Sequence, residues 1–256
     1  MENTQNDIEA TNTAQSAIVD TSLFTVSGVL SSTWRTLFKN PVVFFGLSVL
    51  TVALEFIVVS GVRTLMPGSG NRFLLFFQFF IEMLFGQWIG GAIAYGVYQT
   101  LKGNVASLWA SLFHGMRRLV PLIFVGIIGA LGIFLGFILF IIPGLILMCM
   151  WEVAIPACVV ERLGASESLF RSESLTKGCR MKIFGLRLIV LIAAQIALRS
   201  IAFAMPSVGL ETLVNFQLFA ASIPWAFDSV MTAVIYYELR NVKEGVTVDS
   251  LANVFD

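Results

Sequence analysis

The chain has 256 residues, of which 57% are hydrophobic and 12% are charged, and its formal net charge is zero. Its mean hydropathy is +0.86. A soluble domain has about 45–50% apolar and about 25% charged residues, so this apolar excess is too large for one soluble core and predicts a membrane protein. The charge is balanced and no basic cluster stands out, so nucleic acid is not an expected partner.

Residues 1–24 are polar, mildly acidic and without lysine or arginine. A secretory signal begins with a basic region, so this segment is not expected to be one. Its composition predicts a disordered cytoplasmic tail instead. The transmembrane domain is expected to occupy residues 25–245, and residues 246–256 form a second cytoplasmic tail.

Six apolar segments are expected to cross the bilayer as helices, each of which needs about 20 residues. The expected spans are residues 42–62 and 73–98, two parts of residues 120–160, and residues 183–205 and 212–237. As one helix, residues 120–160 would be about 60 Å long, about twice the hydrocarbon thickness. We therefore expect this segment to fold back at Pro143-Gly144, its strongest reversal signal.

Three shorter segments carry apolar residues on one helical face, namely residues 26–40, 104–119 and 164–178. They are expected to be amphipathic helices at the cytoplasmic interface, the third with Gly178 at its C-terminal cap. Each precedes two spans, which predicts an all-α fold with a threefold repeat of one amphipathic helix and two spans. The alternative is that any cytoplasmic linker of a helical membrane protein has this pattern.

The basic residues predict the orientation, because lysine and arginine concentrate on the cytoplasmic side. With both termini in the cytoplasm, the outer side receives Arg63 and Arg72. The cytoplasmic side then receives Arg35, Lys39, Lys102, Arg117, Arg118, Arg162, Arg171, Lys177, Arg180, Lys182, Arg240 and Lys243. This strong bias favours cytoplasmic termini.

Charged residues inside the expected spans are candidates for functional groups. They are Glu55, Glu82, Glu152, Arg199 and Asp228. A central charge costs about 2.5–3.5 kcal/mol on insertion scales, so these side chains are not expected to face lipid. We expect Arg199 to pair with Glu82 or Glu55, and Asp228 to pair with Arg187 or a polar neighbour. The alternative to structural pairing is a path for a substrate or for protons.

Glu152 is expected near mid-depth and has no evident basic partner. Pro156 has no N–H to donate to the carbonyl of Glu152, so an acid and a free acceptor occur together. Such a break is tolerated in a bilayer only where it is packed in protein or lines water. Two hypotheses stay open, a neutral Glu152 hydrogen-bonded to a neighbouring helix and a ligand or proton site.

Enzyme chemistry is not expected. His114 is the only histidine, and the three cysteines, Cys149, Cys158 and Cys179, are not spaced as a disulfide or metal framework. We therefore predict no catalytic residues, no metal and no cofactor.

Short motifs in the C-terminal half resemble a bacterial membrane family. They are Ile142-Pro143-Gly144, Val160-Glu161-Arg162, Leu169-Phe170-Arg171-Ser172, Leu175-Thr176-Lys177-Gly178, the run from Ala233 to Arg240, and Lys243-Glu244-Gly245. The family is the membrane domain attached to some glycerophosphodiester phosphodiesterases, with its stand-alone YciC-type relatives. The resemblance implies a six-span protein of the bacterial inner membrane. It does not imply phosphodiesterase activity, which belongs to a separate soluble barrel.

The residues that match the family motifs are Glu161, Ser172, Gly178, Arg240 and Glu244. Glu161 is expected at the cytoplasmic end of the fourth span and Arg240 just beyond the sixth. We expect an ion pair between these two residues, which would close the cytoplasmic face.

Two functions agree with these expectations. The first is a non-enzymatic scaffold or accessory subunit, whose cytoplasmic amphipathic helices bind protein partners or lipid headgroups. The alternative is a small transporter or lipid-handling protein that uses the intramembrane acids Glu152 and Asp228. The sequence favours no particular substrate, partner or oligomeric state.

Overall fold

The computed structural model describes residues 24–66, 71–204 and 220–244, and the regular structure within these ranges is all helical. The helices are α2 (Val26–Lys39), α3 (Pro41–Leu65), α4 (Asn71–Leu101), α5 (Leu108–Arg117), α6 (Leu119–Leu139), α7 (Ile141–Met150), α8 (Ala154–Val160), α9 (Ala165–Thr176), α10 (Arg180–Ala204) and α12 (Ser222–Glu244). Both predicted tails, except Phe24, and the first part of the predicted sixth span lie outside the described residues. Phe24 was expected in the first tail, but it is buried in the core.

Five described stretches are long and apolar enough to cross a membrane. They are Pro41–Leu65, Arg72–Leu101, Leu119–Leu139, Ile141–Val160 and Arg180–Ser200. Each is apolar around most of its circumference, as expected of a helix whose neighbours are lipid or other apolar helices. The chain is therefore a helical membrane protein, and these five stretches agree with five of the predicted spans.

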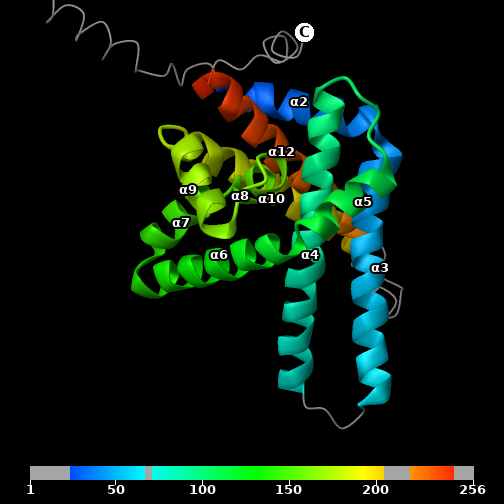
Figure 1. Cartoon of the computed structure of the whole chain (residues 1–256). Helices are drawn as coiled ribbons and strands as arrows, with labels where there is room; N and C mark the ends of the chain where they lie inside the picture. The colour runs from blue at the N-terminus through cyan, green and yellow to red at the C-terminus, as the bar shows by residue number, and fades with distance from the viewer. Residues whose placement is uncertain (1–23, 67–70, 205–219, 245–256) are drawn as a thin grey trace, which may run out of the picture.

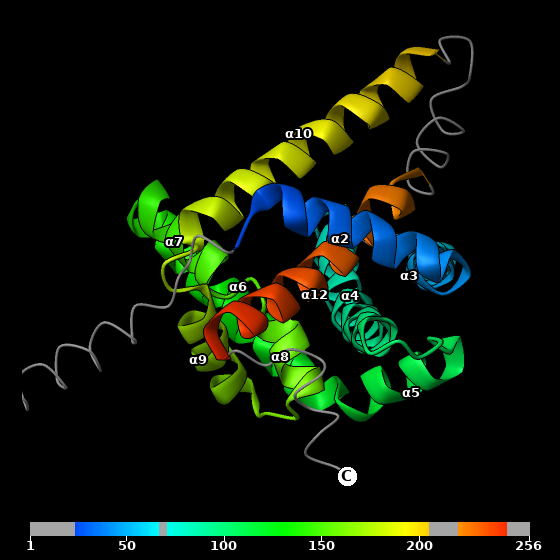
Figure 2. The ribbon, with the colours of Figure 1, turned by 90° about the horizontal axis from the view of Figure 1, so that it is seen from above.

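The apolar helices do not all run in one direction. The helices α3 and α4 lie side by side and antiparallel, whereas α6 runs across them (Figure 1). Viewed along α3 and α4, α10 also runs across them and extends outward from the body (Figure 2). The described helices therefore do not form a simple bundle of parallel spans.

The C-terminal helix α12 lies at the centre of the fold. It contacts α2, α3, α4, α8 and α9, and Figure 2 shows it between α2 and α4. Its side chains Val230, Met231, Ile235 and Leu239 are fully buried. Burying a side chain of this size contributes about 1.5–3 kcal/mol, so α12 holds the two halves of the chain together.

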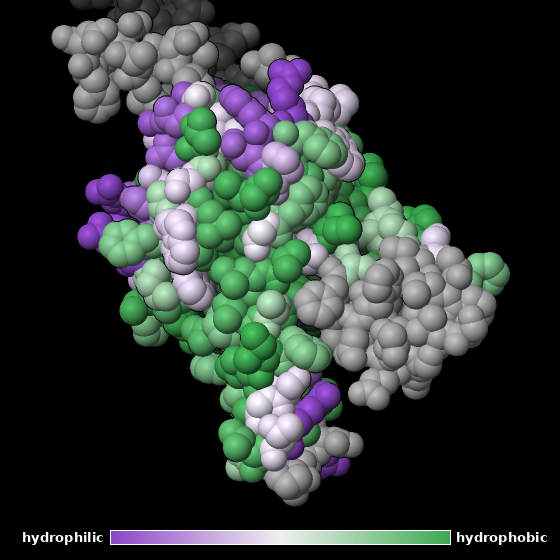
Figure 3. All heavy atoms as spheres, turned by 90° about the vertical axis from the view of Figure 1, so that its right-hand side faces the viewer, coloured by the Kyte–Doolittle hydropathy of each residue, from purple (hydrophilic) through white to green (hydrophobic). Residues whose placement is uncertain are grey.

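The surface is divided into apolar and polar zones. Apolar side chains cover the middle of the face seen in Figure 3, and hydrophilic ones gather at the end where α2 and the end of α12 lie. A smaller hydrophilic group marks the opposite tip, near the turn between α3 and α4. An apolar zone between two polar ends is the surface that a bilayer requires.

The reversal inside residues 120–160 occurs, but at a different residue from the predicted one. The helix α6 ends at Leu139, and Phe140 is extended with φ −162° and ψ 156°. Pro143 lies in the first turn of α7, where backbone N–H groups have no intrahelical acceptor and a missing N–H costs little. The prediction of a Pro143-Gly144 turn is wrong because this proline starts the second helix.

Glycines allow α6 and α7 to approach closely. A Cβ atom on Gly136 would lie 3.0 Å from the backbone of Gly144, and one on Gly144 would lie 2.5 Å from the Phe137 ring. Gly126 and Gly132, also of α6, face Gln87 and Trp151, again too closely for a side chain. A Cβ atom on Gly129 would meet nothing within 4 Å, so a side chain fits there.

Replacing Gly144 by alanine is expected to destabilise the α6–α7 hairpin by about 1–3 kcal/mol, the usual cost of overpacking. The new methyl group would overlap the root of the Phe137 ring, which can move away only by leaving its χ1 rotamer. Reversible unfolding of the detergent-purified protein with a denaturing detergent measures the change. Gly129→Ala is the control and should be neutral or slightly stabilising. Equal stability of the two variants would contradict the close packing.

Candidate functional site

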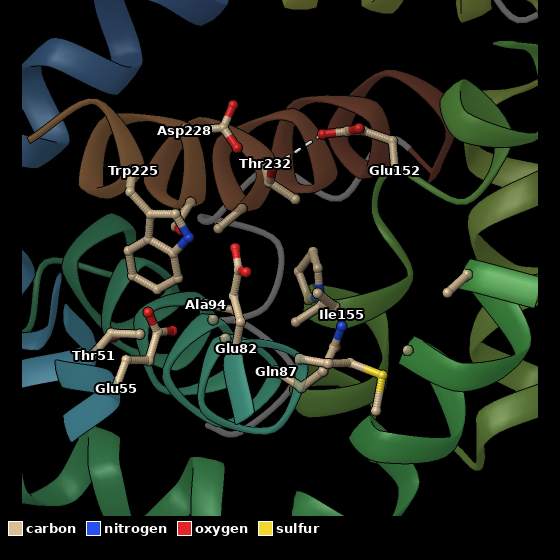
Figure 4. A pocket seen from close by; sticks show the side chains of 18 of the residues that line it. Thr51, Glu55, Glu82, Gln87, Ala94, Glu152, Ile155, Trp225, Asp228 and Thr232 are labelled. Carbon is tan, nitrogen blue, oxygen red and sulfur yellow. Dashed lines mark hydrogen bonds between the residues drawn. The ribbon is translucent and has the colours of Figure 1, made fainter. Parts of the chain in front are cut away.

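A pocket of about 570 Å³ lies where α3, α4, α6, α8, α10 and α12 meet (Figure 4). Four of the five predicted intramembrane residues line it, and Arg199 does not. Its polar lining consists of Thr51, Glu55, Glu82, Gln87, Glu152, Arg187, Trp225, Asp228, Ser229 and Thr232. The pocket is therefore a polar space bounded by helices that are mostly apolar.

Arg187 of α10 joins three other polar side chains of this pocket. Its guanidinium forms ion pairs with Glu152 and with Asp228. It also donates a hydrogen bond to the hydroxyl of Thr232 at 3.0 Å, and Thr232 donates to Glu152 at 3.0 Å. The planar fork of arginine can serve two carboxylates at once, so one side chain connects α10, α12 and the turn between α7 and α8.

The partner of Glu152 is a correction to the sequence analysis, which expected none. Glu152 pairs with Arg187, and its side chain is only 5% exposed. The expected pair between Asp228 and Arg187 is present in the structure. Both carboxylates therefore pair with the same cation, as groups at membrane depth usually do.

The break that positions Glu152 lies between α7 and α8, at residues 151–153. Ala154 N–H donates to the carbonyl of Trp151 at 3.1 Å. The carbonyl of Met150 accepts instead from the hydroxyls of Ser172 at 2.8 Å and Thr176 at 3.2 Å. These two α9 side chains replace the helical partner that Met150 has lost.

Ser172 forms hydrogen bonds with backbone groups on both sides of this break. Its hydroxyl oxygen accepts a hydrogen bond from Val153 N–H at 3.2 Å while its own proton goes to Met150. Ser172 is fully buried, so without it a buried N–H would have no acceptor. The motif residue Ser172 thus supports the turn that presents Glu152 to Arg187.

The other end of the pocket is acidic and aromatic. Figure 4 shows the Glu82 carboxylate pointing from α4 toward α12, with Glu55 of α3 below the Trp225 ring in this view. Within the described residues neither Glu55 nor Glu82 forms an ion pair with a basic side chain. The side-chain amide oxygen of Gln87 is buried and accepts no hydrogen bond from any of the described residues. This end of the pocket therefore holds polar groups that a ligand could satisfy.

Arg199 occupies a different place from the predicted one. It is exposed on the outer half of α10, the part that extends away from the body in Figure 2. No ion pair joins it to Glu82 or Glu55 in the described structure. The prediction of that pair is wrong because α10 does not run alongside α3 and α4.

The motif residues at the polar end form a different network from the predicted one. Glu161 accepts from Arg171 at 2.8 Å and from the Tyr236 hydroxyl at 2.7 Å. Arg171 also pairs with Glu244, whose other oxygen accepts from Arg240 at 2.9 Å. The expected direct pair between Glu161 and Arg240 is therefore replaced by a chain through Arg171 and Glu244.

This network ties α9 to the end of α12. Burial acts to raise the pKa of the Glu244 carboxyl, but hydrogen bonds from Arg240 and Arg171 outweigh burial and hold that pKa below its ordinary value. Gly178 follows the cap of α9 with φ 87°, a left-handed conformation that glycine adopts without strain. The C-terminal cap is therefore Lys177, one residue before the predicted position, and Gly178 is the left-handed residue that follows it.

Five polar pocket residues were not predicted from the sequence, namely Thr51, Gln87, Trp225, Ser229 and Thr232. Thr232 follows Asp228 by four residues, so helical spacing alone places both on one face. Trp225 and Gln87 gave no comparable signal. Within the described residues, no group of three or more His, Cys, Asp or Glu side chains is arranged to hold a metal ion.

The chain was compared with models of known protein families, with curated proteins and with solved structures. No family model, curated protein or solved structure matches it.

Proposed function

We propose that this protein is a small transporter or lipid-handling membrane protein that binds its substrate in the pocket around Glu152, Arg187 and Asp228. The observation that carries the proposal is a pocket of about 570 Å³ with charged side chains among apolar helices. Intramembrane charges are expensive and usually mark a substrate or ion path. A broken helix beside such charges is also typical of transporter binding sites.

The charge of the pocket favours a substrate with a positively charged group. Arg187 is shared between Glu152 and Asp228, which leaves Glu55 and Glu82 without a basic partner in the described structure. The Trp225 ring borders the same end of the pocket as these two acids (Figure 4). A cation is attracted both by carboxylates and by the face of an indole ring, so an ammonium group suits this end of the pocket.

The finer topology belongs to the same proposal. We infer a sixth span over residues 212–237, both termini in the cytoplasm and a threefold repeat of one amphipathic helix and two spans. The helix order α2–α3–α4 followed by α5–α6–α7 supports the repeat. The resemblance to the phosphodiesterase-associated membrane family supports an inner-membrane location and a non-enzymatic role.

The scaffold function stays a prediction. The amphipathic helices use part of their apolar faces inside the protein, because Val29 and Leu37 of α2 and Leu112 of α5 are buried. Trp34, Phe38, Trp109 and Phe113 remain exposed. These aromatic side chains suit an interface with lipid headgroups as well as a protein partner.

Water access to the pocket tests the proposed function. Ser229 lines the pocket, so Ser229→Cys should react quickly with a membrane-impermeant thiol reagent added to proteoliposomes. The background is a protein with alanine at the buried cysteines Cys149, Cys158 and Cys179. Two controls should stay unlabelled, Ser48→Cys in the core and Leu191→Cys on the exposed apolar face of α10. Protection of Ser229→Cys to the same degree as both controls would reject a solvated substrate site.

A further inference from the structure

A second, smaller pocket of about 220 Å³ lies outside the site described above. It is formed where the junction of α5 and α6 meets the turn between α8 and α9. Its lining consists of His114, Arg117, Arg118, Val159 and Arg162. Three guanidinium groups from two separate segments therefore surround one concave site, and no acidic residue lines it.

The three arginines are not neutralised within the described structure. Arg171, Arg187 and Arg240 each form ion pairs with carboxylates, whereas Arg117, Arg118 and Arg162 form none there. Arg117 instead lies over the Phe113 ring, with its guanidinium carbon 4.6 Å from the ring centroid. Like charges brought together repel one another, so an arrangement of this kind is stabilised by an anion between them.

The backbone at Arg162 is unusual. Its φ of 57° makes it the one non-glycine residue with a left-handed backbone among the described residues. A residue other than glycine, asparagine or aspartate rarely adopts this conformation, and such outliers concentrate at functional sites. Glycine at this position would remove the strain but also the side chain that reaches the pocket.

His114 adds a further polar group. Its ring stacks on Tyr95 with the centroids 3.9 Å apart, and its Nδ1 bonds the carbonyl of Ala110 at 2.8 Å. These contacts fix the ring and leave Nε2 without a protein partner in the described structure.

We propose that this pocket binds the phosphate group of an anionic phospholipid. Arginine forks match phosphate oxygens in pairs, and basic pockets at the cytoplasmic ends of membrane helices bind anionic headgroups. Exposed apolar side chains border the site, with Phe113 57%, Met116 45% and Val120 65% exposed. These side chains would contact the acyl region while the arginines hold the headgroup, which favours a lipid over a soluble phosphate compound.

A purely structural role does not explain the arrangement. Basic residues in the last turn of a helix interact favourably with its dipole, which accounts for Arg117 at the end of α5. It does not account for Arg162, which comes from a different segment and has a strained backbone. Convergence of charges from two segments indicates a ligand.

The experiment adds phosphatidylglycerol, or phosphatidylcholine of the same chain length, to the full-length detergent-purified protein and counts bound lipids by native mass spectrometry. The wild type should retain phosphatidylglycerol in preference to phosphatidylcholine. Arg118→Gln and Arg162→Gly should each weaken phosphatidylglycerol binding about five-fold, the contribution of one basic residue near an anionic lipid. Arg35→Gln, an exposed arginine of α2 outside the pocket, is the matched control and should bind as the wild type does.

Arg162→Gly also separates binding from folding. Because glycine tolerates the left-handed backbone, this variant should be at least as stable as the wild type without lipid. Unchanged phosphatidylglycerol binding in Arg118→Gln and Arg162→Gly would overturn the proposal, as would equal weakening in Arg35→Gln. Displacement of the lipid by an equal concentration of inorganic phosphate would keep the phosphate site but overturn its assignment to a lipid.

Discussion

Replacing Arg187 by glutamine is expected to lower the free energy of unfolding by about 3–5 kcal/mol, the cost of removing one partner from a buried ion pair. The Glu152 side chain is 5% exposed and the Asp228 side chain 36% exposed, and both pair with Arg187. Without the guanidinium, two carboxylates would remain near each other at membrane depth. Titration of the detergent-purified protein with a denaturing detergent measures the loss.

Two further variants identify charge as the cause of this loss. A triple variant, Arg187→Gln with Glu152→Gln and Asp228→Asn, removes all three charges and should recover most of the lost stability. Arg199→Gln changes an arginine of the same helix that is exposed, so it should alter stability by less than about 0.5 kcal/mol. The role of the cluster would be refuted if the triple variant were no more stable than Arg187→Gln.

The same cluster is central to the proposed function. Arg187 holds α10 against α12 and the turn between α7 and α8, and it also lines the pocket. An ammonium group bound at Glu55 and Glu82 would share the pocket with this guanidinium and repel it. Substrate binding would therefore weaken the attachment of α10, whose outer half extends from the body (Figure 2).

Hydropathy predicted the membrane helices well. Five of the six expected spans agree with described helices, because about 20 consecutive apolar residues have few alternatives to a membrane helix. The charged residues inside these spans also marked the main pocket, since four of the five line it. The high cost of charge at membrane depth makes such residues informative without any knowledge of the fold.

The ion-pair partners of the charged residues were predicted less well than the helices. Assigning Arg199 to Glu82 or Glu55 assumed that spans run parallel, so that distance from a span end gives depth. Since α6 and α10 run across α3 and α4 (Figures 1 and 2), that assumption fails. The same assumption placed Glu152 away from any cation, although Arg187 lies beside it.

The helix break shows a different limit of sequence reasoning. Pro156 correctly indicated a weakness near Glu152, but the break begins at Trp151, before the residue whose carbonyl the proline frees. Its position depends on Ser172 and Thr176, which bond the Met150 carbonyl from α9. Hydrogen bonds between segments so distant in sequence have no local pattern, so only the resemblance singled out Ser172.

Replacing Ser172 by alanine is expected to destabilise the protein by about 1–3 kcal/mol, the cost of a buried polar group without a partner. Val153 N–H would lose its acceptor, whereas the Met150 carbonyl would keep Thr176 at 3.2 Å. The double change Ser172→Ala with Thr176→Val removes that remaining partner and should cost about 1–3 kcal/mol more. Unfolding with a denaturing detergent measures both variants.

Ser174→Ala is the matched control, because Ser174 lies on the same helix but is exposed, and its hydroxyl bonds only the carbonyl of Arg171, at 2.8 Å. Its stability should remain within about 0.5 kcal/mol of the wild type. Ser172→Ala should also loosen the turn that presents Glu152 to Arg187, so Ser229→Cys in that background should react faster with the thiol reagent. If Ser172→Ala were as stable as Ser174→Ala, the break would not depend on α9, and Glu152 would be positioned by Arg187 and Thr232 alone.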